Sequence, residues 1–157
     1  MEPPSSRLVT VLNELSVGIR PELLQHAVGV TLQQHGLDHG EVCLLLTTDD
    51  RIQELNRSFR GVDEPTDVLT FPSGEPDPLG DVAISIPYAE RQARARGVSL
   101  EQELGYLAIH GALHLAGFDD EDEQDRANMV REMNRAAVAA GLAPDEEWSS
   151  ILHGDPA

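Results

Sequence analysis

The stretch "EVCLLLTTDDRIQELNRSF" at residues 41 to 59 decides the fold, because a continuous apolar run passes directly into a helical pattern. Residues 41 to 48 have the length and composition of a strand covered on both faces, as in sheets that carry helices on each side. Residues 50 to 59 follow helical spacing, and Asp49 is placed to cap that helix. A buried strand beside a helix predicts an α/β fold.

The remaining elements extend this pattern in both directions. Further strands are predicted at residues 7 to 12, 67 to 72 and 80 to 86. Further helices are predicted at residues 20 to 36, 87 to 96, 100 to 116 and 121 to 140, with a last helical piece around 145 to 152. Trp148 is expected to pack this last piece onto the body of the protein. We therefore expect a mixed four-stranded sheet packed with about five helices.

Length and composition favour a single soluble domain. A chain of 157 residues with 40% hydrophobic content fits one core, so residues 1 to 157 are expected to form one domain. The start of the sequence lacks a basic region followed by an apolar run, and no apolar stretch approaches membrane-spanning length. We expect a cytoplasmic protein with no membrane partner. The single cysteine, Cys43, lies within an apolar run, so a cysteine-based mechanism is not expected.

The charge of the chain is strongly negative. Asp and Glu total 28 against 11 basic residues, which gives a formal net charge of -17, and every basic residue is arginine. Such a surface repels polyanions, whereas phosphate neutralisation supplies most nonspecific affinity for nucleic acids. Composition alone therefore argues against a free-standing DNA or RNA binder, and no DNA partner is expected.

Two histidines lie on one face of a predicted helix. They occur in "AIHGALHLAGFDDEDEQD" at residues 108 to 125, as His110 and His114. The start of their helix is marked by Ser99 and Gln102, which have the spacing of a capping box. Residues four apart on a helix are neighbours, so both imidazoles can point at one metal ion.

The residues after this helix offer a third ligand. Gly117 is expected to end the helix and turn the chain back, which would bring Asp119 or Asp120 to the same ion. Two histidines and one carboxylate leave an open coordination position, as a catalytic metal requires. Zinc proteases place a glutamate base directly after the first histidine, but Gly111 stands there. Proteolysis by that mechanism is therefore disfavoured.

The motif around the histidines resembles a known family. "HGALHLAGFDD" (residues 110 to 120) is similar to the HGxLHLxGYDH signature of the YbeY family, metal-dependent endoribonucleases associated with maturation of ribosomal RNA and ribosome quality control. "LNRSFRGVDEPTDVLTFP" (55 to 72) resembles the family's LNxxyRgxdxpTDVLSFP segment, and "LGDVAIS" (79 to 85) its lGDIxIs strand. The three blocks occur in the family's order and cover roughly residues 40 to 135.

The resemblance implies a metal cleft at the histidine helix and assigns roles to particular residues. His110 and His114 match the first two metal-binding histidines, and Arg60 matches the functional arginine, so His110 and Arg60 are the expected catalytic residues. The third histidine does not carry over, because Asp120 stands in its place. A carboxylate is an acceptable ligand for zinc. Three arrangements stay open: Asp120 as the third ligand, Asp119 instead, or a weak or empty site with two histidines.

The resemblance also implies an activity, a cofactor and partners. The expected activity is metal-dependent endonucleolytic cleavage of ribosomal RNA precursors with one divalent ion, zinc in the first place and nickel or manganese as alternatives. Small-subunit ribosomal proteins and an assembly GTPase are the expected protein partners. Arg51 and Arg57 precede Arg60 on one predicted helix, so a local basic patch could admit RNA. The alternatives are a noncatalytic ribosome-assembly factor and a metallohydrolase of a smaller substrate.

Overall fold

A mixed four-stranded sheet forms the centre of the protein, whose computed structural model describes residues 9 to 149. The order across the sheet is β1-β2-β4-β3. The strands β1, β2 and β4 run parallel, whereas β3 pairs with β4 in the antiparallel sense. Their bounds are β1 (Val9–Asn13), β2 (Val42–Thr47), β3 (Val68–Pro72) and β4 (Gly80–Ser85). The predicted sheet is confirmed.

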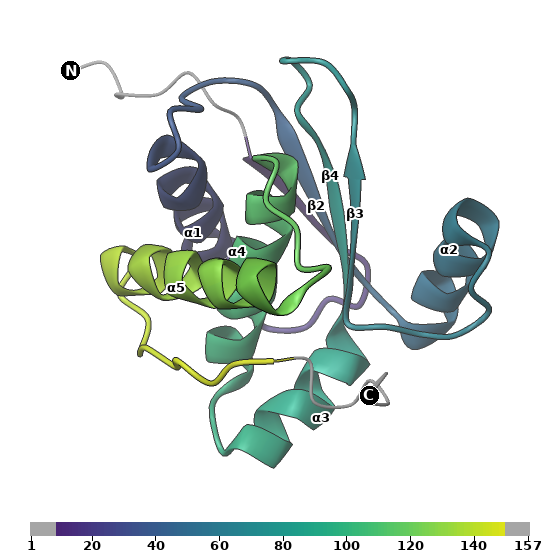
Figure 1. Cartoon of the computed structure of the whole chain (residues 1–157). Helices are drawn as coiled ribbons and strands as arrows, with labels where there is room; N and C mark the ends of the chain where they lie inside the picture. The colour runs from purple at the N-terminus through teal and green to yellow at the C-terminus, as the bar shows by residue number, and fades with distance from the viewer. Residues whose placement is uncertain (1–8, 150–157) are drawn as a thin grey trace.

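Helices cover the two faces of the sheet unequally. Their bounds are α1 (Pro21–Gln33), α2 (Asp49–Arg60), α3 (Ile86–Arg96), α4 (Leu100–Leu115) and α5 (Glu123–Ala139). Figure 1 shows α1, α4 and α5 together on one side of the sheet and α2 alone on the other. Alternate residues of β4 serve the two sides, because Val82 and Ile84 join the large core while Ala83 packs with α2. In the part of the chain that the structure describes, no helix is long and apolar enough to cross a bilayer.

Helix α4 lies at the centre of the core. Eleven of its sixteen residues are buried, and it packs against α1, α3, α5 and two strands of the sheet. A helix that is apolar on all sides is suited to this central position. Between residues 103 and 115 only His110 and His114 are not buried. The core therefore leaves one strip of α4 accessible, and both histidines are on it.

Gly111 sets the close approach of α4 to the sheet. A Cβ atom at Gly111 would lie 2.6 Å from Cγ1 and 3.0 Å from Cγ2 of Val82 on β4. Both distances are shorter than an ordinary carbon contact of about 3.5 to 4.0 Å. The residue that follows the first histidine is therefore directed into the core. This packing explains why the glutamate of the zinc proteases has no counterpart here.

Strand β2 is fully buried on one face and only partly covered on the other, whereas burial on both faces was predicted. Val42, Leu44 and Leu46 are buried towards the helices, but Cys43 and Leu45 on the other face are half-buried. The short helix α2 packs over β3 and β4 and leaves a groove of about 340 Å³ beside these residues. Burial in this groove raises the pKa of the Cys43 thiol, which agrees with an unreactive cysteine.

The cap of α2 differs from the prediction by one residue. Thr48, and not Asp49, is the N-cap, and its side chain accepts a hydrogen bond from the Arg51 backbone N–H at 3.1 Å. Asp49 is the first residue of the helix. Its carboxylate accepts a hydrogen bond from Ser85 Oγ at 2.6 Å and pairs with Arg91 at 2.9 Å. Asp49 therefore makes tertiary contacts with Ser85 and Arg91 and does not cap α2.

The start of α4 is also only half as predicted. The Ser99 hydroxyl accepts a hydrogen bond from the Gln102 backbone N–H at 3.0 Å, as a capping box requires. The Gln102 side chain does not return to Ser99. It forms two hydrogen bonds with the backbone of Ala143, at 2.8 and 3.2 Å, and so attaches the segment after α5 to α4.

The last predicted helical piece is wrong for the residues that the structure describes. Residues 145 to 149 form a turn flanked by residues without regular secondary structure, and residues 150 to 152 lie outside the described part. The Asp145 side chain accepts a hydrogen bond from the Glu147 N–H at 3.1 Å, a local bond that competes with helix formation. The packing of Trp148 onto the body is confirmed, since this residue is only 5% exposed.

The contact between α4 and β4 predicts that Gly111→Ala destabilises the protein. Alanine favours a helix by up to about 1 kcal/mol over glycine. Overpacking against Val82 should outweigh this gain and lower the free energy of unfolding by a net 1 to 2 kcal/mol, roughly. Chemical denaturation measures the difference.

Gly29→Ala in α1 is the matched control, because a Cβ at that position meets nothing within 4 Å. This variant should be as stable as the wild type or more so. In the Gly111→Ala background, Val82→Ala should cost less than it costs alone. A Gly111→Ala protein at least as stable as the wild type would contradict the close approach.

Candidate metal centre

His110, His114 and Asp120 come together at the exposed strip of α4. His110 Nε2 and His114 Nε2 are 3.1 Å apart, and Asp120 Oδ2 lies 3.5 Å from the first and 3.7 Å from the second. The side chains of these residues are 13%, 25% and 41% exposed, in the same order. Among residues 9 to 149 this is the only group of three or more His, Cys, Asp or Glu side chains close enough to share a metal ion.

The turn after α4 brings Asp120 to the histidines. Gly117 has a φ of 101°, a left-handed conformation that glycine adopts without strain. The Gly117 N–H donates to the His114 carbonyl and the Phe118 N–H donates to the Leu113 carbonyl, both at 3.0 Å. This pair of bonds is the Schellman motif, which ends a helix and reverses the chain. The predicted role of Gly117 is confirmed.

The start of α5 holds the loop in place. The Arg126 guanidinium donates hydrogen bonds to the Asp120 carbonyl at 3.3 Å and to the Glu121 carbonyl at 3.2 Å. Asp122 caps α5 by accepting a hydrogen bond from the Asp125 N–H at 2.8 Å. The backbone thereby approaches α4 closely enough for a side chain shorter than histidine to reach both imidazoles.

The three donor atoms fit one metal ion. A tetrahedral zinc ion with bonds of about 2.0 to 2.1 Å separates its ligand atoms by roughly 3.3 to 3.4 Å. The observed separations of 3.1, 3.5 and 3.7 Å bracket that value. Two imidazole nitrogens and one carboxylate oxygen also form a donor set that zinc and other divalent first-row metals accept.

The two histidines keep the carboxyl group of Asp120 ionised. Hydrogen bonds from His110 and His114 lower its pKa far below the ordinary value and outweigh the opposing effect of burial. Asp120 therefore carries a negative charge over the whole neutral and mildly acidic range. A metal ion at this site would face one anionic and two neutral ligands.

Asp119 is not part of the group that the two histidines form with Asp120. It is exposed, and its carboxylate accepts a hydrogen bond from the Glu121 N–H at 3.5 Å. It also lies beside Asp125, whose pKa is raised mainly by a hydrogen bond with Asp119. The geometry therefore favours Asp120 over Asp119 as the partner of the two histidines.

Arg60 is the last residue of α2, and its side chain is exposed. Of the two arginines expected to join it in a basic patch, Arg51 pairs with Glu54 at 2.7 Å and Arg57 with Asp63 at 3.8 Å. None of the ion pairs described between residues 9 and 149 includes Arg60. The expected patch is thus largely neutralised, and Arg60 keeps its charge available to a ligand.

Trp148 and Glu103 lie close to the site, although no sequence pattern placed them there. The Trp148 and His110 ring centroids lie 5.5 Å apart, and Trp148 Nε1 donates a hydrogen bond to Glu103 Oε2 at 3.2 Å. Trp148 follows His110 by almost forty positions in a segment without periodicity, so only the tertiary structure shows this contact. Glu103 is on the histidine helix, and a charged residue among apolar neighbours was the one available signal.

Comparison with known proteins identifies the family of this chain. The family model described as Endoribonuclease YbeY matches residues 15 to 140. The chain belongs to the YbeY endoribonuclease family. The Endoribonuclease YbeY of Persephonella marina is 42% identical over 118 residues, which cover 71% of this chain and 77% of the relative. The Endoribonuclease YbeY of Shouchella clausii is 39% identical over 141 residues, with coverages of 80% and 86%.

A solved structure shares the fold. The solution structure of TM1509 from Thermotoga maritima superposes with a TM-score of 0.59 and 29% identity, and covers 94% of this chain and 99% of that one. The match to the YbeY family model ends at residue 140 of this chain, so Trp148 lies beyond the matched segment. The resemblance seen in the sequence motifs is therefore confirmed, with aspartate at position 120 as this chain's departure from the motif.

The geometry predicts that Asp120→Asn weakens metal binding and that Asp119→Asn does not. Loss of a charged ligand should lower the zinc affinity by more than about 100-fold, beyond the usual cost of losing an outer-shell partner. The charge of the exposed Asp119 is screened by solvent and salt, so the zinc affinity of Asp119→Asn should stay within about threefold of the wild-type value. Competition with a chromophoric chelator measures both affinities. The opposite ranking would assign the third ligand to Asp119.

Proposed function

We propose that this chain is a metal-dependent endoribonuclease that cleaves precursors of ribosomal RNA, with one divalent ion held by His110, His114 and Asp120. The observation that carries the proposal is the convergence of these three donor atoms in a member of the YbeY endoribonuclease family. The relatives compared above are named as endoribonucleases, and this chain has all three sequence blocks of the family. Residues 1 to 157 are proposed to work as one domain in the cytoplasm.

The ion would supply Lewis acidity at a phosphodiester and would favour activation of water. The chain's own residues orient that chemistry. His110 and His114 present their Nε2 atoms from a rigid, buried helix, and Asp120 adds a negative charge from the adjoining loop. Zinc is the proposed ion because the donors are two imidazoles and one carboxylate, and nickel and manganese are the alternatives.

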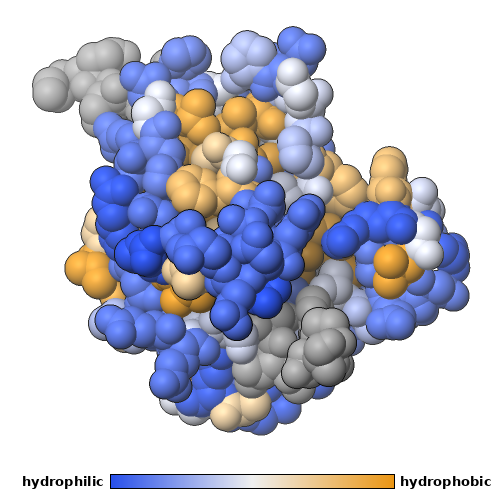
Figure 2. Space-filling model, in the orientation of Figure 1, coloured by the Kyte–Doolittle hydropathy of each residue, from blue (hydrophilic) through white to orange (hydrophobic). Residues whose placement is uncertain are grey.

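Arg60 is proposed to bind a phosphate of the RNA. A guanidinium group matches two phosphate oxygens with two parallel hydrogen bonds, and no described acidic side chain competes for it. This role also addresses the charge of the chain. Figure 2 shows that the face of α5 and the loop before it is largely hydrophilic, and this region is rich in carboxylates. RNA would therefore approach the metal site from the side of the arginine.

The acidic surface suits protein partners better than naked RNA. With a net charge of -17, long-range attraction favours basic surfaces. We propose that small-subunit ribosomal proteins, and an assembly GTPase, deliver the chain to its RNA. The substrate is then presented locally, and binding need not depend on the nonspecific phosphate contacts that this surface disfavours.

The proposal predicts that His114→Ala abolishes both metal binding and RNA cleavage. The variant removes a ligand from the part-exposed side of the centre, so the fold should remain intact. Untagged protein should be analysed for metal content, and cleavage of a defined ribosomal RNA precursor fragment should be followed in parallel. Equal cleavage by wild type and variant would identify a contaminating nuclease. Metal binding without any cleavage in the wild type would favour a noncatalytic assembly factor.

The role of Arg60 predicts that Arg60→Ala lowers kcat/KM for RNA without loss of metal. A hydrogen bond to a charged group contributes about 1.5 to 3 kcal/mol, so the decrease should be roughly tenfold to 100-fold. Arg51→Ala is the matched control, because this arginine lies on the same helix and is paired with Glu54. Equal effects of the two variants would reduce the role of Arg60 to general electrostatics.

A further inference from the structure

Trp148 packs against a proposed metal ligand from outside the family-matched segment. It lies in the segment after α5, beyond residues 15 to 140. Its ring centroid lies 5.5 Å from that of His110 with an angle of 41° between the planes. Trp148 is only 5% exposed, so the indole is packed inside the protein. The indole therefore packs against one side of the His110 imidazole.

The orientation of the His110 ring depends on packing, because no hydrogen bond from the described residues holds its Nδ1 atom. Histidines that bind metals usually donate this N–H to an acceptor, which fixes the ring orientation. In the part of the chain described here, His110 Nδ1 is buried and has no hydrogen-bond partner. Among residues 9 to 149 the other ring in contact with His110 is that of His114, with the ring centroids 4.7 Å apart, and His114 is itself a proposed ligand. Packing against Trp148 is therefore a contact that can orient the His110 ring without the metal.

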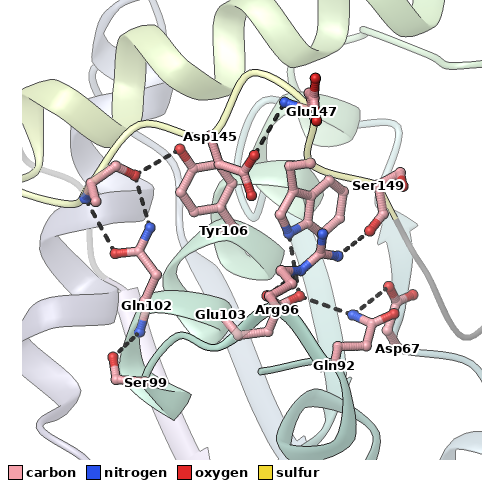
Figure 3. Close-up of polar contacts among 12 residues, drawn as sticks. Asp67, Gln92, Arg96, Ser99, Gln102, Glu103, Tyr106, Asp145, Glu147 and Ser149 are labelled. Atoms are coloured by element: carbon pink, nitrogen blue, oxygen red, sulfur yellow. Dashed lines mark hydrogen bonds and ion pairs between the residues drawn. The ribbon is translucent and has the colours of Figure 1, made fainter. Parts of the chain in front are cut away.

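The indole is anchored to the helix that carries His110. Trp148 Nε1 donates a hydrogen bond to Glu103 on α4, about two helical turns before His110. Glu103 is 1% exposed, pairs with Arg96 at 2.8 Å and accepts a hydrogen bond from Gln92 at 2.9 Å, a network drawn in Figure 3. The Arg96 guanidinium also lies 5.0 Å from the indole centroid. This buried network therefore anchors Trp148 to α4, the same helix that carries His110.

We propose that Trp148 is a positioning residue of the metal centre. It holds the imidazole of His110 in the orientation that directs Nε2 towards His114 and Asp120. This inference rests on the proposed metal-binding function of those three residues. A merely structural tryptophan would stabilise the segment after α5 without affecting the affinity for a metal.

Metal affinity of two Trp148 variants tests the inference. Trp148→Ala removes the indole ring that packs against His110. It should weaken zinc binding by about tenfold to 100-fold, the usual cost of losing a partner that orients a ligand. Trp148→Phe keeps a ring and should recover most of the affinity. Gln102→Ala is the matched control, since it removes both hydrogen bonds to Ala143 and loosens the same segment without touching His110. It should lower stability and leave the affinity unchanged.

The fluorescence of the wild-type protein gives a second test that needs no variant. Trp148 is the only tryptophan in the chain, so its emission reports on this site alone. Co²⁺ bound beside His110 should quench the emission in step with the appearance of the visible Co²⁺ absorption bands. Quenching that saturates at one ion per chain is the expected result.

The outcomes separate this inference from the proposed function. Co²⁺ bands without quenching would show that the ion binds away from Trp148 and would overturn the inference. Equal zinc affinities of folded Trp148→Ala and wild type, or equal losses in Trp148→Ala and Gln102→Ala, would overturn it too, while the metal site itself would stand. A wild-type chain that binds neither ion would overturn the proposed metal site, and the positioning role with it.

Discussion

The packing of α4 onto β4 is the constraint on which the rest of the structure depends. The helix is buried on nearly all sides, and Gly111 allows it to lie directly on Val82. This close approach fixes the rotation of the helix about its axis. Because residues three and four apart share a helix face, the same rotation that turns Gly111 into the core leaves His110 and His114 at the accessible strip. Core packing therefore orients the site.

A glycine-ended helix then converts two histidines into a three-donor centre. The Schellman turn at Gly117 reverses the chain. Arg126 donates a hydrogen bond to the Asp120 carbonyl and so holds the loop close enough to α4 for the Asp120 side chain to reach both imidazole rings. An aspartate at this position stays ionised, so the centre is less positive than one with three imidazoles. In a chain of net charge -17, the centre therefore adds little positive charge for a phosphate, and the proposed role of Arg60 is to supply it.

The elements were predictable where local pattern and tertiary packing agree. The apolar runs of β2 and β4 and the helical spacing of α1 to α5 identified the sheet and its helices, because burial imposes these periods on the sequence. Two capping predictions failed because a distant partner competed with a local one. Asp49 bonds to Ser85 and Arg91 in place of capping α2, and Gln102 bonds to Ala143 in place of completing its capping box. The residues next to Asp49 and Gln102 in the sequence give no indication of these distant partners.

The sequence by itself determined the α/β class, the family, and the two histidines with a carboxylate close behind them, since spacing along a helix and a glycine stop are local properties. Only the tertiary structure decided that Asp120 faces the histidines while Asp119 faces solvent, and that Trp148 lies against His110. The direction of a side chain in a turn depends on what the turn packs against. Contacts between a helix and a segment far along the chain depend on the whole core that brings them together.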